Sequence, residues 1–182
     1  MPTDEELVER SRAGDRSAFE ELFIRYRDVV FNVAWSISGD REQAEDITQE
    51  AFVRAYRGLV GFRGESRFST WLYRIVVNQA IRTKGVAGRR QRQETRIEDA
   101  TMASGDLQPD GAAERSDLER RVRGALSELS PEHRAAVTLR YLERLDLQEI
   151  AEIVGCPVGT VKSRLFHALK NMSFLLRDLR DV

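Results

Sequence analysis

Residues 145–165 have the sequence LDLQEIAEIVGCPVGTVKSRL, which is typical of two helices joined by a tight turn. Asp146 and Glu149 have the spacing of a capping box, so the first helix is expected to begin here. Gly155 suits the left-handed residue that ends a helix, and Pro157 suits the first turn of the next one. These signals predict a helix-turn-helix.

The second helix of this pair has one apolar side and one cationic side. Val158, Val161 and Leu165 recur at helical spacing and are expected to point inward. No acidic residue occurs from Ile153 to Arg177. A packed inner side and a cationic outer side are what a recognition helix needs to lie against DNA. The alternative is an ordinary antiparallel helix pair whose charged side is merely solvated.

Composition limits the classes of protein that the chain can represent. Its 182 residues are enough for one domain or two small ones, and a net charge of -1 means that a nucleic-acid partner requires segregated positive charge. Cys156 is the only cysteine, which excludes an intrachain disulfide and a multi-cysteine metal site, and His133 and His167 lie far apart. We therefore expect no cofactor and no metal.

Two further classes are not expected. The N-terminus is acidic and lacks an apolar signal region, and no apolar run approaches the length of a membrane span, so a cytoplasmic protein is predicted. The sequence has no paired nucleophile and base, no metal-spaced cluster and no phosphate-binding glycine loop. An enzyme is therefore not predicted.

The first half of the chain predicts a bundle of four helices. We expect them at residues 5–13, 17–37, 40–58 and about 68–82, with Ser17 capping the second and residues 38–40 ending it. The second helix carries apolar residues at intervals of three and four, which is typical of a main core helix. The third helix has an outer side that the core does not need, formed by Asp46, Gln49, Glu50, Arg54 and Arg57.

The loop before the fourth helix, and that helix itself, exceed what a plain bundle requires. Phe62 looks exposed between two glycines, and the surrounding polar and aromatic residues are Arg63, Arg67, Tyr73, Arg74, Asn78 and Arg82. Aromatic rings beside arginines commonly hold single-stranded nucleic acid. The alternative is that the rings pack helices together, which is the preferred interpretation for Trp71. For Phe62 and Asn78 both interpretations remain open.

The middle of the chain predicts a linker. Residues 84–96 are basic, residues 98–119 are mostly acidic, and the stretch contains Gly105, Pro109 and Gly111 without apolar periodicity. Ser116 and Ser130 are then expected to cap two supporting helices before the helix-turn-helix. No strand signal occurs. We predict an all-α protein with domains at 1–84 and 116–182, joined by a flexible linker at 85–115.

Four blocks of residues resemble those of the extracytoplasmic-function (ECF) sigma factors of the sigma-70 family. They are residues 44–52 (AEDITQEAF), 62–66 (FRGES), 70–75 (TWLYRI) and 159–165 (GTVKSRL). Their order, their spacing and the total length match, and the likeness covers almost the whole chain apart from the linker. Four ordered blocks are far more specific than a helix-turn-helix alone.

This resemblance implies a role for the first domain. Asp46, Gln49, Glu50 and Arg54 would dock on the clamp helices of the β′ subunit of RNA polymerase core, since a polar, partly acidic face suits a basic coiled coil. The residues that would capture a flipped base of the opened -10 element are Phe62, Arg63, Arg67, Tyr73, Arg74 and Asn78. The linker would thread through the polymerase channels.

The resemblance also implies a role for the second domain, which would recognise duplex DNA at the -35 element. The residues on its contact face are Thr160, Lys162, Ser163, Arg164, Phe166 and His167. His167 stands where the family frequently has arginine, and a mostly neutral imidazole weakens a phosphate or guanine contact. An anti-sigma factor is a further expected partner. The competing hypothesis is a stand-alone helix-turn-helix regulator with an N-terminal sensing or dimerisation domain.

Overall fold

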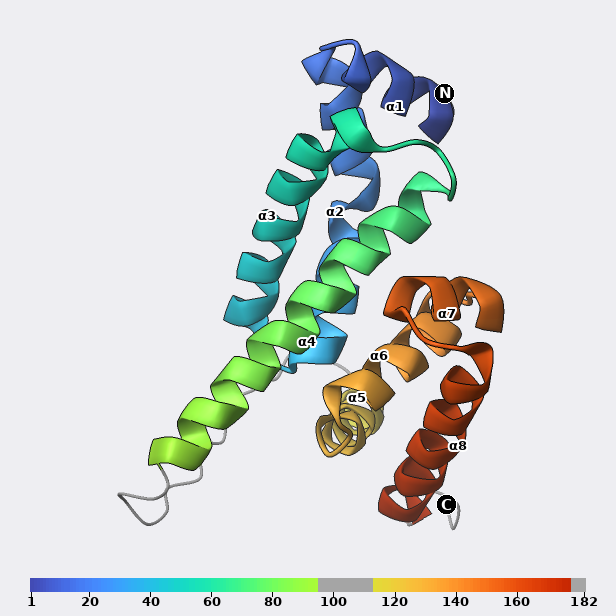
Figure 1. Ribbon diagram of the computed structural model, residues 1–182. Helices are drawn as coiled ribbons and strands as arrows, with labels where there is room; N and C mark the ends of the chain where they lie inside the picture. Colours follow the sequence, from blue (N-terminus) through green and yellow to red (C-terminus); the bar gives the residue numbers. More distant parts are fainter. Residues whose placement is uncertain (95–112, 178–182) are drawn as a thin grey trace.

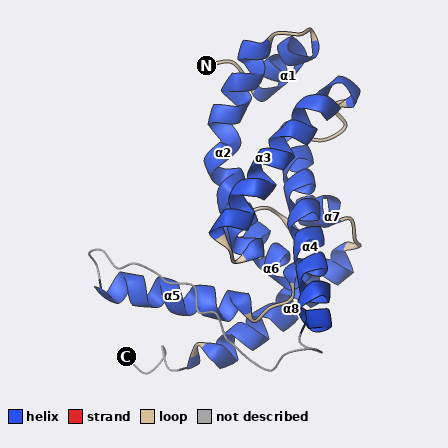
Figure 2. Cartoon of the chain, turned by 90° about the vertical axis from the view of Figure 1, so that its left-hand side faces the viewer, coloured by secondary structure: helices blue, strands red, loops and turns tan. Residues whose placement is uncertain are grey.

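The computed structural model describes residues 1–94 and 113–177, and within these ranges it contains helices and no strand (Figures 1 and 2). The α-helices are α1 Asp4–Arg12, α2 Arg16–Ser38, α3 Arg41–Gly58, α4 Phe68–Glu94, α5 Ala113–Ser127, α6 Pro131–Val137, α7 Leu147–Val154 and α8 Val158–Leu175. A short 3-10 turn, η1 Leu59–Gly61, follows α3, and a π-helical turn, η2 Thr138–Leu142, follows α6. The predicted all-α class is confirmed.

The N-terminal group is a bundle in which α2, α3 and α4 lie side by side and α1 packs across one end (Figure 1). Its core consists of fully buried aliphatic side chains, among them Leu22, Ile37, Ile47 and Leu72. The predicted cap of α2 is wrong by two residues, because Asp15 rather than Ser17 accepts the first free backbone amides. Its carboxylate is a stronger acceptor than the serine hydroxyl, which itself donates to Asp15.

The C-terminal group contains the predicted helix-turn-helix. Asp146 and Glu149 form the reciprocal capping box at the start of α7. Gly155 ends α7 with a φ of 68°, in the left-handed region that glycine adopts without a steric penalty. Ile150 and Val161, one from each helix, are completely buried, so the inner sides of α7 and α8 pack as the periodicity predicted. The cationic side of α8 is therefore turned outward.

Helices α4 and α5 are longer than the sequence pattern predicted. Helix α4 continues to Glu94 instead of ending near residue 82, and α5 begins at Ala113 rather than at Ser116. Residues 83–94 contain no proline, and a glycine inside a helix costs only about 1 kcal/mol, so nothing in this stretch stops the helix. Most of the predicted linker, residues 95–112, lies outside the described residues.

The two helical groups pack against each other. Helix α7 lies against α4, and α6 lies against the C-terminal end of α2 (Figure 1). Arg134 of α6 is buried at this junction, where its Nη1 donates to the carbonyl oxygen of Ile37. Within residues 1–94 and 113–177, none of the helices has the length and apolar character that crossing a bilayer requires.

Candidate polymerase and nucleic-acid interfaces

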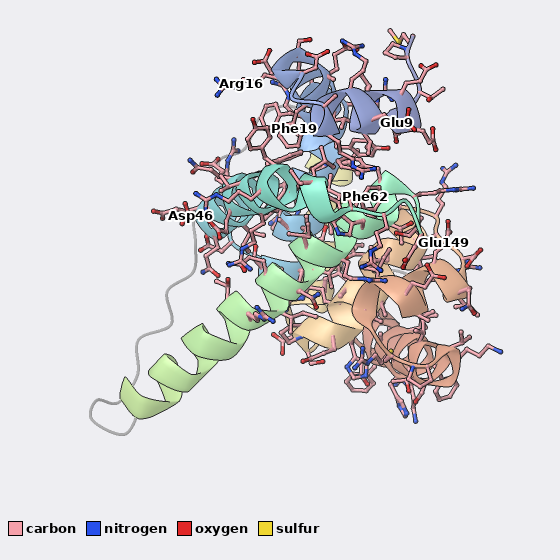
Figure 3. The ribbon with its side chains drawn as sticks, turned by 45° about the horizontal axis from the view of Figure 1, so that its top comes forward. Glu9, Arg16, Phe19, Asp46, Phe62 and Glu149 are labelled. Atoms are coloured by element: carbon pink, nitrogen blue, oxygen red, sulfur yellow. The ribbon has the colours of Figure 1, made fainter. Side chains whose placement is uncertain are left out.

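The outer side of α3 presents the four residues that the sequence grouped there. Asp46, Gln49 and Arg54 are exposed and Glu50 is half-buried. Arg54 Nε donates to Glu50 Oε1 across 2.7 Å, a pair one helical turn apart. Asp46 points away from the body of the molecule (Figure 3). The structure therefore brings these side chains together as one polar face that is free to meet a partner.

An aromatic groove adjoins this polar face, and the sequence analysis missed it. The groove has a volume of about 550 Å³ and is lined by Phe19, Phe23, Gln49, Phe52, Val53, Tyr56 and Arg57. Tyr56 is 47% exposed, and its ring packs edge-on against Phe19 with centroids 4.9 Å apart. The signal available in the sequence was that Val53 and Tyr56 fall outside the inner side of the third helix. We name these seven residues the α2–α3 groove.

Phe62 does not occupy the position predicted for it. Its side chain is only 9% exposed, and its ring lies 4.9 Å from that of Trp71 and 6.4 Å from that of Phe68. The expectation that Phe62 is exposed is therefore wrong for this structure. The reason is that Phe68 and Trp71, in the first turn of α4, form an apolar site. The loop packs its only large apolar side chain, that of Phe62, into this site. The packing interpretation of Trp71 is confirmed.

The remaining residues predicted for the -10 element divide into two sets. Arg63, Arg67, Arg74 and Asn78 are exposed, whereas Tyr73 is 7% exposed. Burial raises the pKa of Tyr73 well above its ordinary value of 10.0, and the nearby Glu143 carboxylate acts in the same direction. Tyr73 is therefore a neutral hydrogen-bond donor at any physiological pH.

Three of these residues make their polar contacts with the C-terminal group. Tyr73 Oη donates to Glu143 Oε2 across 2.9 Å, and Arg74 Nε donates to the carbonyl oxygen of Glu152 across 3.0 Å. Arg67 Nη1 lies 3.6 Å from Glu149 Oε1. Glu149 belongs to α7, which lies beside the start of α4 (Figure 3). No local pattern in the sequence indicates these contacts.

The outer side of α8 carries the residues predicted for duplex DNA. Lys162, Ser163 and His167 are exposed, and Thr160 and Arg164 are half-buried. These side chains offer several donors and two full positive charges along one helix, which suits phosphate oxygens and base edges. Arg164 also lies toward the turn, with Nη1 3.7 Å from the Cys156 sulfur.

The same helix exposes more apolar surface than a recognition helix needs. Phe166 is 64% exposed and meets the His167 ring edge-on at 5.5 Å between centroids. Leu169 and Phe174, which the sequence analysis did not single out, are 41% and 65% exposed. Among the described residues, no group of three or more metal-ligating side chains comes together.

Comparisons with known proteins agree with both groups of helices. The family model described as Sigma-70 region 2 matches residues 22–100, and that described as Sigma-70, region 4 matches residues 119–172. The chain is 38% identical over 183 residues to the RNA polymerase sigma-H factor of Pseudomonas aeruginosa, covering 97% of this chain and 95% of that protein. It is 41% identical over 175 residues to the ECF RNA polymerase sigma-E factor of Escherichia coli K12, covering 91% and 90%.

Solved structures share the fold. The sigma factor RpoE of Bartonella quintana, crystallised with the anti-sigma factor NepR, superposes with a TM-score of 0.69 at 25% identity, covering 87% of this chain and 96% of that one. CnrH, solved with the cytosolic domain of CnrY, superposes with a TM-score of 0.70 at 24% identity, covering 96% and 97%.

Proposed function

This chain belongs to the sigma-70 family as a sigma factor of the ECF type, and we propose that three of its surfaces bind core polymerase, the -10 element and the -35 element. The protein binds RNA polymerase core and directs promoter recognition and opening at the -10 and -35 elements. The observation that supports this function is that a region 2 match and a region 4 match occur in order on one chain. A stand-alone regulator has no need of a region 2 domain.

The polymerase-binding surface is the polar face of α3 together with the α2–α3 groove. Asp46, Gln49, Glu50 and Arg54 provide polar and charged contacts for the β′ clamp helices. The groove beside them offers aromatic surface that a partner side chain can desolvate, which is the usual source of most binding energy in an interface. Gln49 belongs to both, so the two surfaces are continuous.

The -10 surface consists of the 62–67 loop and the adjoining side of α4, on which Arg63, Arg67, Arg74 and Asn78 are exposed and Tyr73 is buried. Arg63, Arg67 and Arg74 would hold phosphates, while Tyr73 and Asn78 would contact an unpaired base. Phe62 is left out of this set because its ring packs against the rings of Phe68 and Trp71. Capture of this kind traps bases that have already left the duplex.

The -35 surface is the outer side of α8. We assign base contact to Arg164, whose guanidinium matches the acceptors of guanine, and assign phosphate or mixed contacts to Lys162, Ser163 and Thr160. Phe166 and His167 lie next along the helix and complete the face. We propose domains at 1–84 and 116–182 joined by residues 85–115; α4 extends into this joining segment as far as Glu94, and α5 begins within it at Ala113.

Partners and location follow from the family. We propose a cytoplasmic protein, because the RNA polymerase that it binds acts there, and no catalytic activity of its own. The Bartonella quintana relative was solved with an anti-sigma factor, so we propose a comparable inhibitor for this chain.

In vitro transcription with purified RNA polymerase core on genomic DNA, with mapping of the 5′ ends, tests the function. We expect new 5′ ends that share -10 and -35 motifs and that require this protein. Core binding should weaken in Glu50→Arg, which reverses a charge on the α3 face, and should be unchanged in the exposed control Glu9→Arg on α1. Failure of the wild-type chain to bind core would refute the proposal.

A further inference from the structure

A cavity of about 630 Å³ lies at the junction of the two helical groups. Its walls come from the C-terminal half of α2, from α5 and from η2, and its volume is in the range that small organic ligands occupy. The apolar part of the lining consists of Trp35, Val122, Leu126 and Leu142. None of these residues belongs to the proposed polymerase, -10 or -35 surfaces, so promoter recognition leaves the cavity without a role.

A buried positive charge also lines this cavity. Arg134 is 5% exposed, and the hydrogen bonds from its Nη1 and Nη2 all go to neutral backbone carbonyls. Among the described residues, its Nε has no acceptor and its guanidinium forms no ion pair. Burial lowers the pKa of Arg134, and the charge of Glu128 only partly opposes this effect. Because a buried charge without a counter-ion is destabilising, an anion in the cavity would stabilise this site.

The other charged residues of the lining leave an excess of positive charge. They are Arg123, whose guanidinium lies 4.3 Å from the centroid of the Trp35 ring, and Glu143. The Glu143 carboxylate accepts a hydrogen bond from Tyr73 Oη across 2.9 Å. Two guanidinium groups thus stand against one carboxylate in the lining. Because like charges repel, an acidic ligand group would lie on the Arg134 side of the cavity and away from Glu143.

We propose that this cavity binds a free aliphatic monocarboxylate, with its acid group toward the Arg134 guanidinium and its chain against Val122, Leu126 and Leu142. Arginine stays protonated and presents several donors in the geometry that a carboxylate accepts. An aliphatic chain fits the cavity better than an aromatic ring, because the Arg123 guanidinium already lies over the Trp35 ring. Leu142 is 57% exposed, so a bound chain would remove apolar surface from water.

Isothermal titration calorimetry with the full chain tests the class of ligand. The probes are octanoate, below its micelle-forming concentration, and 1-octanol, which has the same chain length without the charge. We expect octanoate to bind at a single site and about tenfold more tightly than 1-octanol, the effect of a charge-assisted hydrogen bond. Equal affinities would overturn the role of Arg134, and the absence of octanoate binding would overturn the site itself.

Trp35 reports where the probe binds. The sequence contains two tryptophans, and Trp71 packs with Phe62 and Phe68 outside this cavity. In Trp71→Phe, the fluorescence of Trp35 should therefore change on addition of octanoate, with the dissociation constant that calorimetry gives. A calorimetric signal without any change at Trp35 would mean that octanoate binds elsewhere, and the proposal would be wrong.

A matched pair of substitutions tests occupancy of the cavity. Val122→Trp fills the cavity from α5, whereas Val60→Trp places the same side chain on η1, at a position that is 75% exposed and outside the lining. We expect Val122→Trp to abolish octanoate binding and Val60→Trp to leave it unchanged. Ser36→Phe fills the cavity from α2 and serves as a second blocking variant.

Circular dichroism checks that each variant is folded. Full octanoate affinity in the folded blocking variants, or an equal loss in Val60→Trp, would overturn the proposal. Neither core binding nor transcription is measured in these experiments, so the proposed function is tested separately.

Discussion

Arg134 Nη1 lies 2.7 Å from the carbonyl oxygen of Ile37, and this hydrogen bond joins the two helical groups across 97 positions of sequence. Ile37 is in the last turn of α2, where carbonyl groups have no partner within the helix and the helix dipole is negative. A buried guanidinium satisfies this end and the end of α5 together, because Nη2 donates to the Ser127 and Leu129 carbonyls.

Replacing this guanidinium should destabilise the whole chain. Arg134→Met keeps much of the volume but leaves three carbonyl oxygens without their donor, so we expect a loss of about 2–4 kcal/mol in the free energy of unfolding in urea. Arg140→Met is the control, because Arg140 donates to the Leu145 carbonyl from an exposed position and should cost less than about 1 kcal/mol. Equal losses would show that the buried junction adds no stability.

Truncating the α2–α3 groove should weaken polymerase binding. Tyr56→Ala removes an aromatic side chain that is 47% exposed, and we expect about tenfold weaker binding to core, the effect of a moderate hot spot. Fluorescence anisotropy with labelled protein measures the affinity. Ile24→Ala also removes an exposed apolar side chain, at 64% exposure and outside the groove, and should leave the affinity unchanged. A weaker affinity for both variants would contradict a specific groove.

Asn78 should matter for opening and not for duplex binding. Asn78→Ala removes an exposed amide from α4 and should slow promoter opening, followed by the reactivity of unpaired thymines to permanganate. Binding to the closed promoter, measured by gel shift with core present, should change little. Equal losses in the two assays would argue against base capture.

The outer side of α8 should set the use of the -35 element. Lys162→Ala and Arg164→Ala should reduce transcription from promoters with an intact -35 sequence, and a lost base contact should cost about 1–3 kcal/mol. Lys170→Ala, an exposed lysine further along α8, serves as the control. If both test variants ignore changes in the -35 sequence, the assignment of this face is incorrect.

Local signals in the sequence predicted the ends of α7 well, although they missed the cap of α2 and the end of α4. Asp146 with Glu149, and Gly155 nine residues after Asp146, act within one or two turns, so neighbouring residues contain the necessary information. The exposure of Phe62 was predicted wrongly because burial depends on Phe68 and Trp71 as they are arranged after folding. The outward-facing charges of α3 were predictable because helical periodicity fixes which side the core occupies.

Contacts between the two groups were beyond sequence reasoning. Tyr73 and Glu143 are 70 positions apart, and neither forms a local pattern that indicates the other. The same holds for Arg134, which is 5% exposed although charged side chains are rarely buried. Its acceptors are backbone carbonyls, which every residue has, so no particular residue type indicates them.

Gly39 ends α2 with a φ of 69°, and a β-carbon built there would lie 3.2 Å from Arg134 Nη1. Two unrelated demands therefore meet at one position, since most side chains are strained in that conformation and any of them would crowd the buried guanidinium. A library randomised at residue 39 and selected for folded protein should return almost only glycine. At Gly14, where φ is 95° and a β-carbon would meet nothing within 4 Å, asparagine should also be tolerated.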